Sequence, residues 1–368
     1  MPIMLKGEKI NIEAVLAEKK HLIDKKIEKY IPRKIDEKYL ESLIGRPFYE
    51  YSTDAVQKAI TDPIWDLLDR GGKRWRPALF LLITEALGGD LEKVSDFIII
   101  PEVVHNGTLM ADDVEDSSAL RRGKPCTHIL FGADVAINAA EAMYFIPTVV
   151  LRKSRGLFDD KTLLRAYEIF CEDMTNLTVG GQCVDIYWHR GLGNGENITE
   201  SKYLQMCCGK TGSLARMSAR LAAALSGANG KQEYALGRFA ESIGVAFQIQ
   251  DDILNLIAES GKGQFVKDYI GSDITEGKRT LMVIHTLKNA SKIEKARLLE
   301  ILNMHTSDKK LIKEAIDMLR KYNSMEYAKS KARELVKNAW NEVEPLLSES
   351  RAKEMLRSFA DYLIERQI

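Results

Sequence analysis

Apolar side chains recur every three or four positions along most of this chain, which is the spacing of α-helices that bury one face. The pattern runs from residue 62 to residue 368 with few alternating, strand-like runs, and only nine prolines in the whole chain could interrupt it. Polar or Gly-rich joints divide it into predicted helices of about 15–25 residues. These joints lie at 88–90, 190–197, 226–231 and 259–263. We therefore predict an all-α protein.

The first 60 residues differ in composition from the rest. They are rich in Lys, Glu and Ile, keep helical spacing, and are broken at Pro32 and Pro47. We interpret residues 1–60 as N-terminal accessory helices and residues 61–368 as the main domain. The charged, amphipathic stretch from Ser307 onward is predicted to supply peripheral helices that close the bundle.

Charge and cysteine content exclude several classes of protein. The 53 Lys and Arg side chains balance 53 Asp and Glu, so no overall field attracts nucleic acid or an anionic membrane, and any basic site must be a local cluster. The five cysteines are odd in number, lack paired zinc-ligand spacing and follow no signal peptide, which favours the reducing cytoplasm. The longest apolar runs fall short of the roughly 18 residues needed to cross a bilayer, so no membrane span is expected.

Two acidic clusters stand inside otherwise apolar, helix-compatible stretches. The first is Asp112-Asp113-Val114-Glu115-Asp116 and the second is Asp251-Asp252-Ile253-Leu254-Asn255. Positions i, i+1 and i+4 lie on one side of a helix, so each cluster gathers its acids on one face. Half-buried carboxylates are costly without a cation, and Mg²⁺ binds one or two carboxylates while keeping other positions for water and phosphate oxygens. The two clusters therefore predict a diphosphate site bridged by Mg²⁺.

Basic residues occur close to these acids. Lys73 and Arg76 follow Gly71-Gly72, and glycine lets a backbone approach an anion closely. Arg121 and Arg122 come shortly after the first acidic cluster. Clustered Lys and Arg side chains donate charge-assisted hydrogen bonds to phosphate oxygens. For the first pair alone a solvated loop is an equally good interpretation, whereas the position of the second pair favours phosphate binding.

Three further polar sites accompany the acids. His105 precedes Asp112 by seven residues, two helical turns, so both lie on nearly the same face and diphosphate contact is favoured over a satisfied core histidine. Gln182 and Asp185 are spaced i, i+3 and could add a carboxylate, although a buried polar pair is nearly as good an interpretation. Gly209-Lys210-Thr211 resembles the end of a P-loop but lacks the upstream glycine, so we expect a cation and a hydroxyl there and no ATP site.

In their order and spacing these motifs resemble those of the trans-isoprenyl diphosphate synthases. The matching segments are Gly-Gly-Lys-Arg-x-Arg-Pro at 71–77, the two aspartate clusters, Arg-Arg-Gly-Lys-Pro at 121–125, Gly-Lys-Thr at 209–211, and the run from Gly271 to Lys278. The resemblance covers roughly residues 62–345. It implies the isoprenoid synthase fold, a single large antiparallel helical bundle around a deep central cavity, usually as a homodimer. It also implies Mg²⁺-dependent chain elongation, in which isopentenyl diphosphate is added head to tail to an allylic diphosphate.

The resemblance further implies roles for single residues. It implies that three Mg²⁺ ions are held by Asp112, Asp116 and Asp251, with support from Asp113, Asp185 and Asp252. It implies that the allylic diphosphate is bound by Arg121, Lys210 and Lys278, and the diphosphate of isopentenyl diphosphate by Lys73, Arg76, His105 and Arg122. It places Thr211 and Gln248 beside the carbocation, where hydroxyl and amide dipoles stabilise developing positive charge.

The chain departs from the family pattern at two positions. Asn255 ends the second acidic cluster where many members have Asp, which weakens the local negative charge but leaves the first two carboxylates in place. Tyr269 stands where the family often has a lysine, so Lys267, two residues earlier, is the candidate substrate-binding lysine.

Product length is expected to depend on the helical turn before Asp112. Family members with short products have bulky aromatic residues at this turn, whereas this chain has Gly107 and Thr108. We therefore expect a product of C20 (geranylgeranyl) or C25 length, with Tyr144 and Phe145 as a deeper floor. Two alternatives remain: a class I terpene cyclase, which has no use for a second diphosphate site, and a non-catalytic subunit of a heteromeric synthase, which would be expected to have lost acids.

Overall fold

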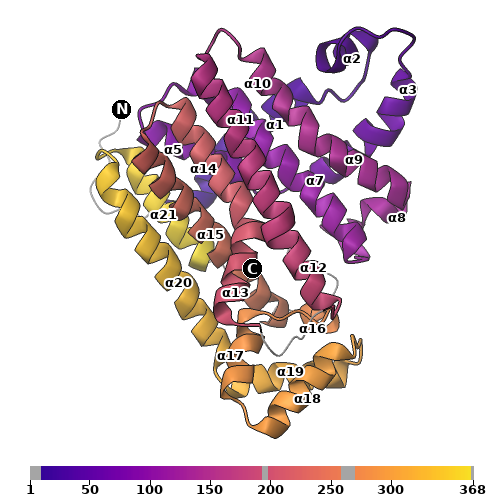
Figure 1. The fold of residues 1–368 in the computed structure, drawn as a ribbon, viewed down its shortest axis with the longest axis vertical. Helices are drawn as coiled ribbons and strands as arrows, with labels where there is room; N and C mark the ends of the chain where they lie inside the picture. The colour runs from indigo at the N-terminus through magenta and orange to yellow at the C-terminus, as the bar shows by residue number, and fades with distance from the viewer. Residues whose placement is uncertain (1–9, 193–197, 258–269, 366–368) are drawn as a thin grey trace.

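The computed structural model describes residues 10–192, 198–257 and 270–365, and this part of the chain is almost entirely helical (Figure 1). The two strands of the described part are two residues each and form one antiparallel hairpin. The all-α prediction is therefore confirmed.

The first half of the chain runs through short and medium helices. They are α1 (Ile12–Tyr30), α2 (Glu37–Ile44), α3 (Thr53–Val56), η1 (Gln57–Thr61), α4 (Asp62–Asp69), α5 (Trp75–Ala86), α6 (Leu91–Val94), η2 (Ser95–Ile98), α7 (Ile99–Glu115), β1 (Leu120–Arg121), β2 (Lys124–Pro125), α8 (Thr127–Phe131), α9 (Ala133–Phe145), η3 (Ile146–Thr148), α10 (Val149–Lys153) and α11 (Asp160–Thr175).

The second half contains the longest helices. They are η4 (Asn176–Gln182), α12 (Cys183–His189), α13 (Glu200–Cys207), η6 (Cys208–Gly212), α14 (Ser213–Leu225), α15 (Gly230–Ile257), α16 (Ser272–Thr275), α17 (Leu281–Asn289), α18 (Lys292–Asn303), α19 (Lys309–Lys321), α20 (Ser324–Val343), η7 (Glu344–Leu346) and α21 (Arg351–Glu365).

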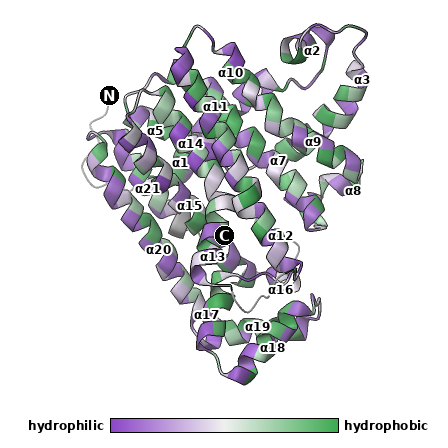
Figure 2. Cartoon of the chain, viewed as in Figure 1, coloured by the Kyte–Doolittle hydropathy of each residue, from purple (hydrophilic) through white to green (hydrophobic). Residues whose placement is uncertain are grey.

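The core lies between α5, α7, α14 and α15. Every residue of α5 is buried except Glu85, so this helix is apolar on all sides, as expected for the centre of a bundle. The surrounding helices are amphipathic, and Figure 2 shows hydrophilic and hydrophobic residues alternating along them. The prediction that the C-terminal stretch supplies peripheral helices agrees with α20 and α21, which pack on the outside of α15 and α5.

The N-terminal helix α1 belongs to the same hydrophobic core. Its residues Ile12, Leu16, Ile23 and Ile27 are buried within that core, and the helix contacts α5, α7 and α21. Helices α3, η1 and α4 follow one another without a break, so the predicted division at residue 60 falls inside a continuous helical run. The separate accessory role of residues 1–60 stays a prediction.

One stretch is an exception to the expectation that no apolar segment is long enough to cross a membrane. Ala133–Lys153, which spans α9, η3 and α10, passes by length and composition, and 39% of its most apolar window is buried. A helix packed in a soluble protein passes the same test, and here Ala139, Ala140 and Met143 are buried in the hydrophobic core. The stretch is therefore weak support for a membrane span.

Candidate active site

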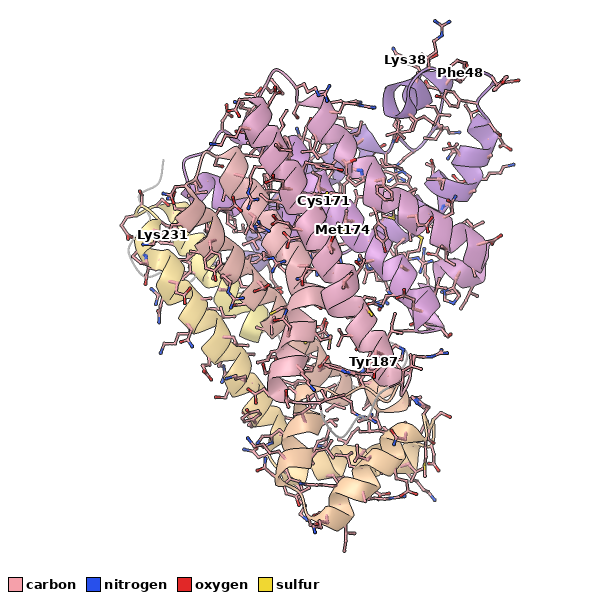
Figure 3. The ribbon with its side chains drawn as sticks, viewed as in Figure 1. Lys38, Phe48, Cys171, Met174, Tyr187 and Lys231 are labelled. Atoms are coloured by element: carbon pink, nitrogen blue, oxygen red, sulfur yellow. The ribbon has the colours of Figure 1, made fainter. Side chains whose placement is uncertain are left out.

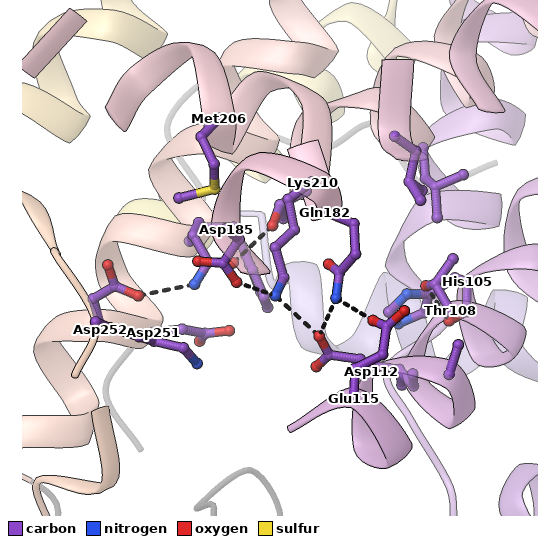
Figure 4. A pocket seen from close by; sticks show the side chains of 18 of the residues that line it. His105, Thr108, Asp112, Glu115, Gln182, Asp185, Met206, Lys210, Asp251 and Asp252 are labelled. Atoms are coloured by element: carbon purple, nitrogen blue, oxygen red, sulfur yellow. Dashed lines mark hydrogen bonds and ion pairs between the residues drawn. The ribbon is translucent and has the colours of Figure 1, made fainter. Parts of the chain in front are cut away.

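The two acidic clusters lie on different helices that lead to one cavity. Asp112, Asp113 and Asp116 occupy the C-terminal end of α7, and Asp251 and Asp252 lie near the end of α15. The end of α7 already carries the negative pole of the helix dipole, so three acids there increase the demand for a cation. The cavity has a volume of about 660 Å³, and Asp112, Asp251 and Asp252 are among its lining residues (Figure 4).

Lys210 and Gln182 hold the first cluster from the opposite wall. The Lys210 ammonium lies 2.9 Å from Asp112 Oδ1 and 2.6 Å from Asp185 Oδ2. Gln182 Nε2 donates to Asp112 Oδ1 at 2.9 Å and to Glu115 Oε2 at 2.6 Å. Burial opposes the charge on Lys210, but Asp112 and Asp185 raise its pKa above the usual lysine value. Burial likewise opposes the charge on Asp185, whose pKa is held below its usual value by Lys210 and Lys278.

Close contact between two backbones brings these residues together. A Cβ atom on Gly181 would lie 2.0 Å from the Lys210 backbone nitrogen, and one on Gly209 would lie 2.4 Å from the Gly181 nitrogen. The two glycines sit in the irregular turns η4 and η6, where wide helical turns are typical of functional sites. Only glycine at both positions permits this approach, which places Gln182 and Asp185 opposite Lys210.

Asp113 points away from the cavity and holds Arg121. Arg121 Nε lies 2.9 Å from Asp113 Oδ1 and 3.1 Å from Oδ2, and its NH2 group also contacts Asp113. Asp113 is 1% exposed, whereas Arg121 lines the cavity and lies 3.8 Å from Asp112. Asp113 is thus placed to orient Arg121, and its predicted part in holding Mg²⁺ stays a prediction.

Lys278 lies beside Asp116, the last acid of the first cluster. Its ammonium lies 4.0 Å from Asp116, 3.5 Å from Asp273 and 2.6 Å from Glu276. The Asp116 side chain is only 2% exposed. Burial opposes the charge on Lys278, but Asp273, Glu276 and Asp116 raise its pKa.

A chain of hydrogen bonds fixes the second cluster. Thr211 Oγ1 donates to Gln248 Oε1 at 2.7 Å, Gln248 Nε2 donates to Asp252 Oδ1 at 2.8 Å, and the Tyr203 hydroxyl donates to Asp252 Oδ2 at 2.7 Å. Burial and the neighbouring Asp273 carboxylate raise the pKa of Asp252. Thr211, Gln248 and Asp252 all line the cavity, as does Tyr203.

Asn255 has a structural role that was not predicted from the sequence. The Asn255 side chain donates from Nδ2 to Ser272 Oγ at 2.7 Å, and its Oδ1 accepts from the Asp273 backbone N–H at 3.1 Å. The Asn255 backbone carbonyl accepts from the Gly271 backbone N–H at 2.8 Å. These bonds bring Asp273 to the cavity wall. Asp273 therefore supplies a carboxylate close to the position where the second cluster has Asn255 and lacks one.

A second group of basic side chains includes two arginines without an ion pair among the described residues. Lys73, Arg76 and His105 line the cavity, and Arg122 is held by the Leu67 and Gly71 carbonyls and by Asn106. No carboxylate of the described residues forms an ion pair with Arg76 or Arg122. Burial lowers the pKa of both guanidiniums to about 10, and burial next to these arginines lowers the pKa of His105. Such a group favours an incoming anion.

Arg74, between Lys73 and Arg76 in sequence, has a different role. It forms ion pairs with Glu102 at 2.9 Å and Asp24 at 3.0 Å and is absent from the cavity wall. Gly72 has a φ of +135°, and a Cβ atom there would lie 3.2 Å from the Arg122 guanidinium. The glycine thus lets this turn pack closely against Arg122.

The sequence did not predict two residues that lie near Lys73. Lys73 Nζ lies 2.8 Å from the Tyr362 hydroxyl, which in turn lies 3.0 Å from Glu13 Oε1. Glu13 comes from α1 and Tyr362 from α21, so both chain ends meet at this part of the cavity. No local motif marks either residue, because only the tertiary fold brings them to Lys73.

The predicted product-length residues divide into two sets. Thr108 and Tyr144 line the cavity. Gly107 instead faces α9, where a Cβ atom would lie 2.8 Å from Met143 Cβ, and Phe145 turns outward with 68% of its surface exposed. The expectation that these two residues face the cavity is therefore wrong, because α7 and α9 pack against each other through Gly107. Lys267 lies outside the described residues.

The carboxylates suit Mg²⁺ only if a ligand joins them. No three His, Cys, Asp or Glu side chains in the described ranges converge closely enough to hold a metal ion by themselves. The donors are hard carboxylate oxygens on opposite walls, and Mg²⁺ commonly takes few protein ligands and completes its shell with water and phosphate. The donor set therefore fits Mg²⁺ bound together with a diphosphate.

Comparisons with known proteins agree on one family. A family model described as polyprenyl synthetase matches residues 57–319. The chain is 32% identical over 333 residues to a short chain isoprenyl diphosphate synthase of Methanothermobacter thermautotrophicus, covering 88% of this chain and 98% of that protein. It is 36% identical over 299 residues to a geranylgeranyl pyrophosphate synthase of Geoglobus acetivorans, covering 81% and 88% of the two chains. The crystal structure of geranylgeranyl pyrophosphate synthetase from Pyrococcus horikoshii superposes with a TM-score of 0.82 at 31% identity, covering 97% of this chain and 98% of that one.

Proposed function

This chain belongs to the polyprenyl synthetase family and is a trans-prenyltransferase, and we propose that it joins isopentenyl diphosphate to an allylic diphosphate to form all-trans geranylgeranyl diphosphate, C20, with Mg²⁺ as cofactor. One arrangement carries the proposal. The cavity has one set of cations paired with carboxylates and a second basic group in which Arg76 and Arg122 form no ion pair among the described residues, as two diphosphates with different tasks require.

The first set serves the diphosphate that leaves. The allylic C–O bond breaks, and its electron pair departs with the diphosphate. Arg121, Lys210 and Lys278 are placed to donate hydrogen bonds to that growing negative charge. Asp112, Asp116 and Asp251, supported by Asp185 and Asp252, would hold Mg²⁺, which would supply further positive charge to the same group. We propose three ions per site.

The second set holds the nucleophile. Lys73, Arg76, His105 and Arg122 bind the diphosphate of isopentenyl diphosphate, so that its double bond faces the allylic carbon. The double-bond electrons form the new C–C bond, and the resulting cation loses a proton to the released diphosphate, which restores a double bond. No protein nucleophile is needed.

The walls protect the cation between these steps. The Thr211 hydroxyl proton is engaged by Gln248, so the hydroxyl lone pairs remain to face developing positive charge. Leu177, Leu214 and Phe247 line the cavity and exclude the water that would quench the cation.

The second cation set favours elongation over the alternatives. A class I terpene cyclase ionises one allylic diphosphate and has no second diphosphate for Arg76 and Arg122 to bind. A non-catalytic subunit would not need Lys210 between the carboxylates of Asp112 and Asp185 in the cavity wall.

We also propose a homodimer in the cytoplasm. Exposed apolar side chains recur on α9, α11 and η4, where Phe145, Leu164 and Val179 are 68%, 59% and 66% exposed. An exposed apolar surface on adjacent helices is typical of an interface. All five cysteines are free, as expected in a reducing compartment.

A product assay tests the proposal. Purified protein with radiolabelled isopentenyl diphosphate, farnesyl diphosphate and Mg²⁺ is expected to give a C20 diphosphate. Asp112→Ala should lower kcat by about a hundredfold or more, because it removes charge stabilisation at the leaving group. Glu115→Ala is the matched control on the same helix turn and should cost far less.

Each other outcome counts against the proposal. Cyclic hydrocarbon formed from the allylic diphosphate alone would indicate a cyclase. Turnover that appears only after a second protein is added would indicate a subunit, and a main product of C25 would overturn the assigned length.

A further inference from the structure

The chain is neutral overall, but positive charge collects at one end of the molecule. Between Lys288 and Lys337 the sequence has ten lysines and three arginines against seven Asp and Glu residues. This stretch contains α18, α19 and the first part of α20, and Figure 1 places α18 and α19 at the end of the molecule beyond α16. We call residues Lys292–Lys321, which form α18 and α19 and their turn, the basic hairpin.

Four lysines of the basic hairpin are exposed and form no ion pair among the described residues. Lys292, Lys309, Lys310 and Lys313 are exposed, and no carboxylate of the described residues forms an ion pair with them. Both acids of α19 are already engaged by arginines. Arg297 lies 2.7 Å from Glu314, and Arg320 lies 3.5 Å from Asp317. The lysine charge therefore faces solvent as a local positive surface.

An apolar side chain stands within this positive surface. Ile293 is 82% exposed and lies between Lys292 and Glu294, whose carboxylate contacts Lys321 of α19 at 2.5 Å. Met304, at the other end of α18, is 46% exposed. Lysines around exposed apolar groups are typical of surfaces that lie against anionic lipid headgroups.

The basic hairpin is joined directly to a segment that lines the cavity. Thr275 Oγ1 donates to the Thr306 carbonyl at 2.8 Å, and Arg279 donates to Asn303 Oδ1 at 2.6 Å. Gly271 packs against Ile312, where a Cβ atom would lie 2.5 Å from its methyl group. The segment held in this way carries Asp273 and Lys278, which line the cavity.

We propose that the basic hairpin docks on an anionic phospholipid surface and holds the cavity mouth beside the bilayer. The delivery of product to lipid rests on the proposed function, because a C20 diphosphate has a charged head and a tail that partitions into lipid. A membrane fits this surface better than nucleic acid does, because nucleic acid backbones offer no apolar phase for Ile293.

Vesicle binding tests the docking without any turnover. The full chain is mixed with vesicles of phosphatidylglycerol and phosphatidylcholine, or of phosphatidylcholine alone, and sedimented. We expect binding to the anionic vesicles that weakens as salt rises from about 0.05 M to about 0.5 M, since screening shortens the reach of surface charge.

Charge reversal locates the surface. Lys309→Glu/Lys310→Glu/Lys313→Glu should weaken partitioning about a hundredfold or more, and glutamate at 309 and 310, in the first turn of α19, favours the helix. The matched control is Lys34→Glu/Lys38→Glu/Lys58→Glu, which changes the net charge equally on exposed residues of the opposite end, where Figure 3 labels Lys38. The control should bind like the unaltered chain, and Ile293→Ser should reduce the binding that survives high salt.

Several results would overturn the proposal. These are absence of binding to anionic vesicles at low salt, equal loss in both triple variants, and binding to duplex DNA under conditions where vesicles are not bound. Delivery has its own readout, since anionic vesicles should speed steady-state release of the C20 product for the unaltered chain and not for the hairpin variant. A chain that binds vesicles but makes no prenyl product would refute the proposed function and leave the docking surface intact.

Discussion

At the scale of single residues, two neighbours on α7 face different environments. Thr108 lines the cavity, whereas Gly107 packs against α9 so closely that an added Cβ would lie 2.8 Å from Met143 and 3.0 Å from the Ala140 carbonyl. Chain growth can be limited only by a side chain that reaches the cavity. We therefore propose that Thr108 controls product length, together with Tyr144, which also lines the cavity.

We predict that Thr108→Phe shortens the product from C20 to C15, because an aromatic ring at this position occupies the space of the growing tail. Chromatography of the dephosphorylated products measures the change. Gly107→Phe is the control: it should lower the free energy of unfolding by about 1–3 kcal/mol through overpacking between α7 and α9. An unchanged product from a folded Thr108→Phe protein would place the floor elsewhere.

The adjacent arginines of the 71–77 segment allow a second test. Arg76→Ala should raise KM for isopentenyl diphosphate about 10- to 100-fold, because it removes a charge-assisted contact, and should leave KM for the allylic substrate unchanged. Arg74→Ala should instead lower the free energy of unfolding by about 3–5 kcal/mol, because it leaves Glu102 buried without its partner. Steady-state kinetics and urea unfolding separate the two effects, and a rise in the allylic KM for Arg76→Ala would contradict the assignment.

At the scale of elements, local patterns predicted the helices and their acids better than the contacts between them. The spacing within 112–116 and 251–255 is a property of one helix, so the sequence was sufficient to predict it. Glu13 and Asp273 reach the cavity, and Tyr362 reaches Lys73, only through tertiary packing, and no periodicity marks them. The glycines at 181 and 209 were visible, but their partnership depends on two irregular turns that no local pattern predicts.

We predict that Gly181→Ala abolishes most activity and destabilises the protein, because its methyl group would overlap the Lys210 backbone at 2.0 Å and force η4 and η6 apart. Gly180→Ala is the matched control, since its Cβ would meet only the Asn176 side chain, which can rotate away. Activity and thermal unfolding of the two variants measure the difference. Equal behaviour would show that the close approach of the turns is unnecessary.

A cluster of hydrogen bonds to Asp96 of η2 holds helix α1 in place. Asp96 accepts from Lys26 at 2.5 Å, Lys29 at 2.6 Å and the Tyr30 hydroxyl at 2.6 Å. Burial alone would raise the pKa of the Asp96 carboxyl, but these hydrogen bonds lower that pKa from 3.8 to about 2. A carboxyl with a depressed pKa stabilises the folded state above its unfolded pKa and loses that contribution as it is protonated.

We therefore predict that Asp96→Asn lowers the free energy of unfolding by about 1 kcal/mol at pH 7, after allowance for solvent screening. The difference between the two proteins should shrink as pH falls from about 4 toward 2. Urea unfolding at pH 7 and pH 3 measures it. A difference that stays constant over this range would mean that Asp96 does not contribute through its charge.

At the scale of the whole molecule, periodicity predicted the fold class, because a chain with helical spacing throughout can bury its apolar faces only against other helices. It did not predict which apolar faces would stay uncovered in one copy. Phe145 was expected at the cavity floor, yet it lies on the outside of α9, whose buried face is occupied by α7. An apolar residue can satisfy the helical pattern and still belong to a surface between two copies.

We predict that this outer face forms the dimer interface. Phe145→Glu/Leu164→Glu should convert a dimer into a monomer, because two charges buried without partners cost more than an interface of ordinary size gains. Light scattering after size exclusion measures the mass. Ile293→Glu alters an even more exposed apolar residue at the far end of the molecule and should leave the dimer intact. If the unaltered chain is a monomer at micromolar concentration, or if the double variant remains a dimer, the interface does not lie on α9 and α11.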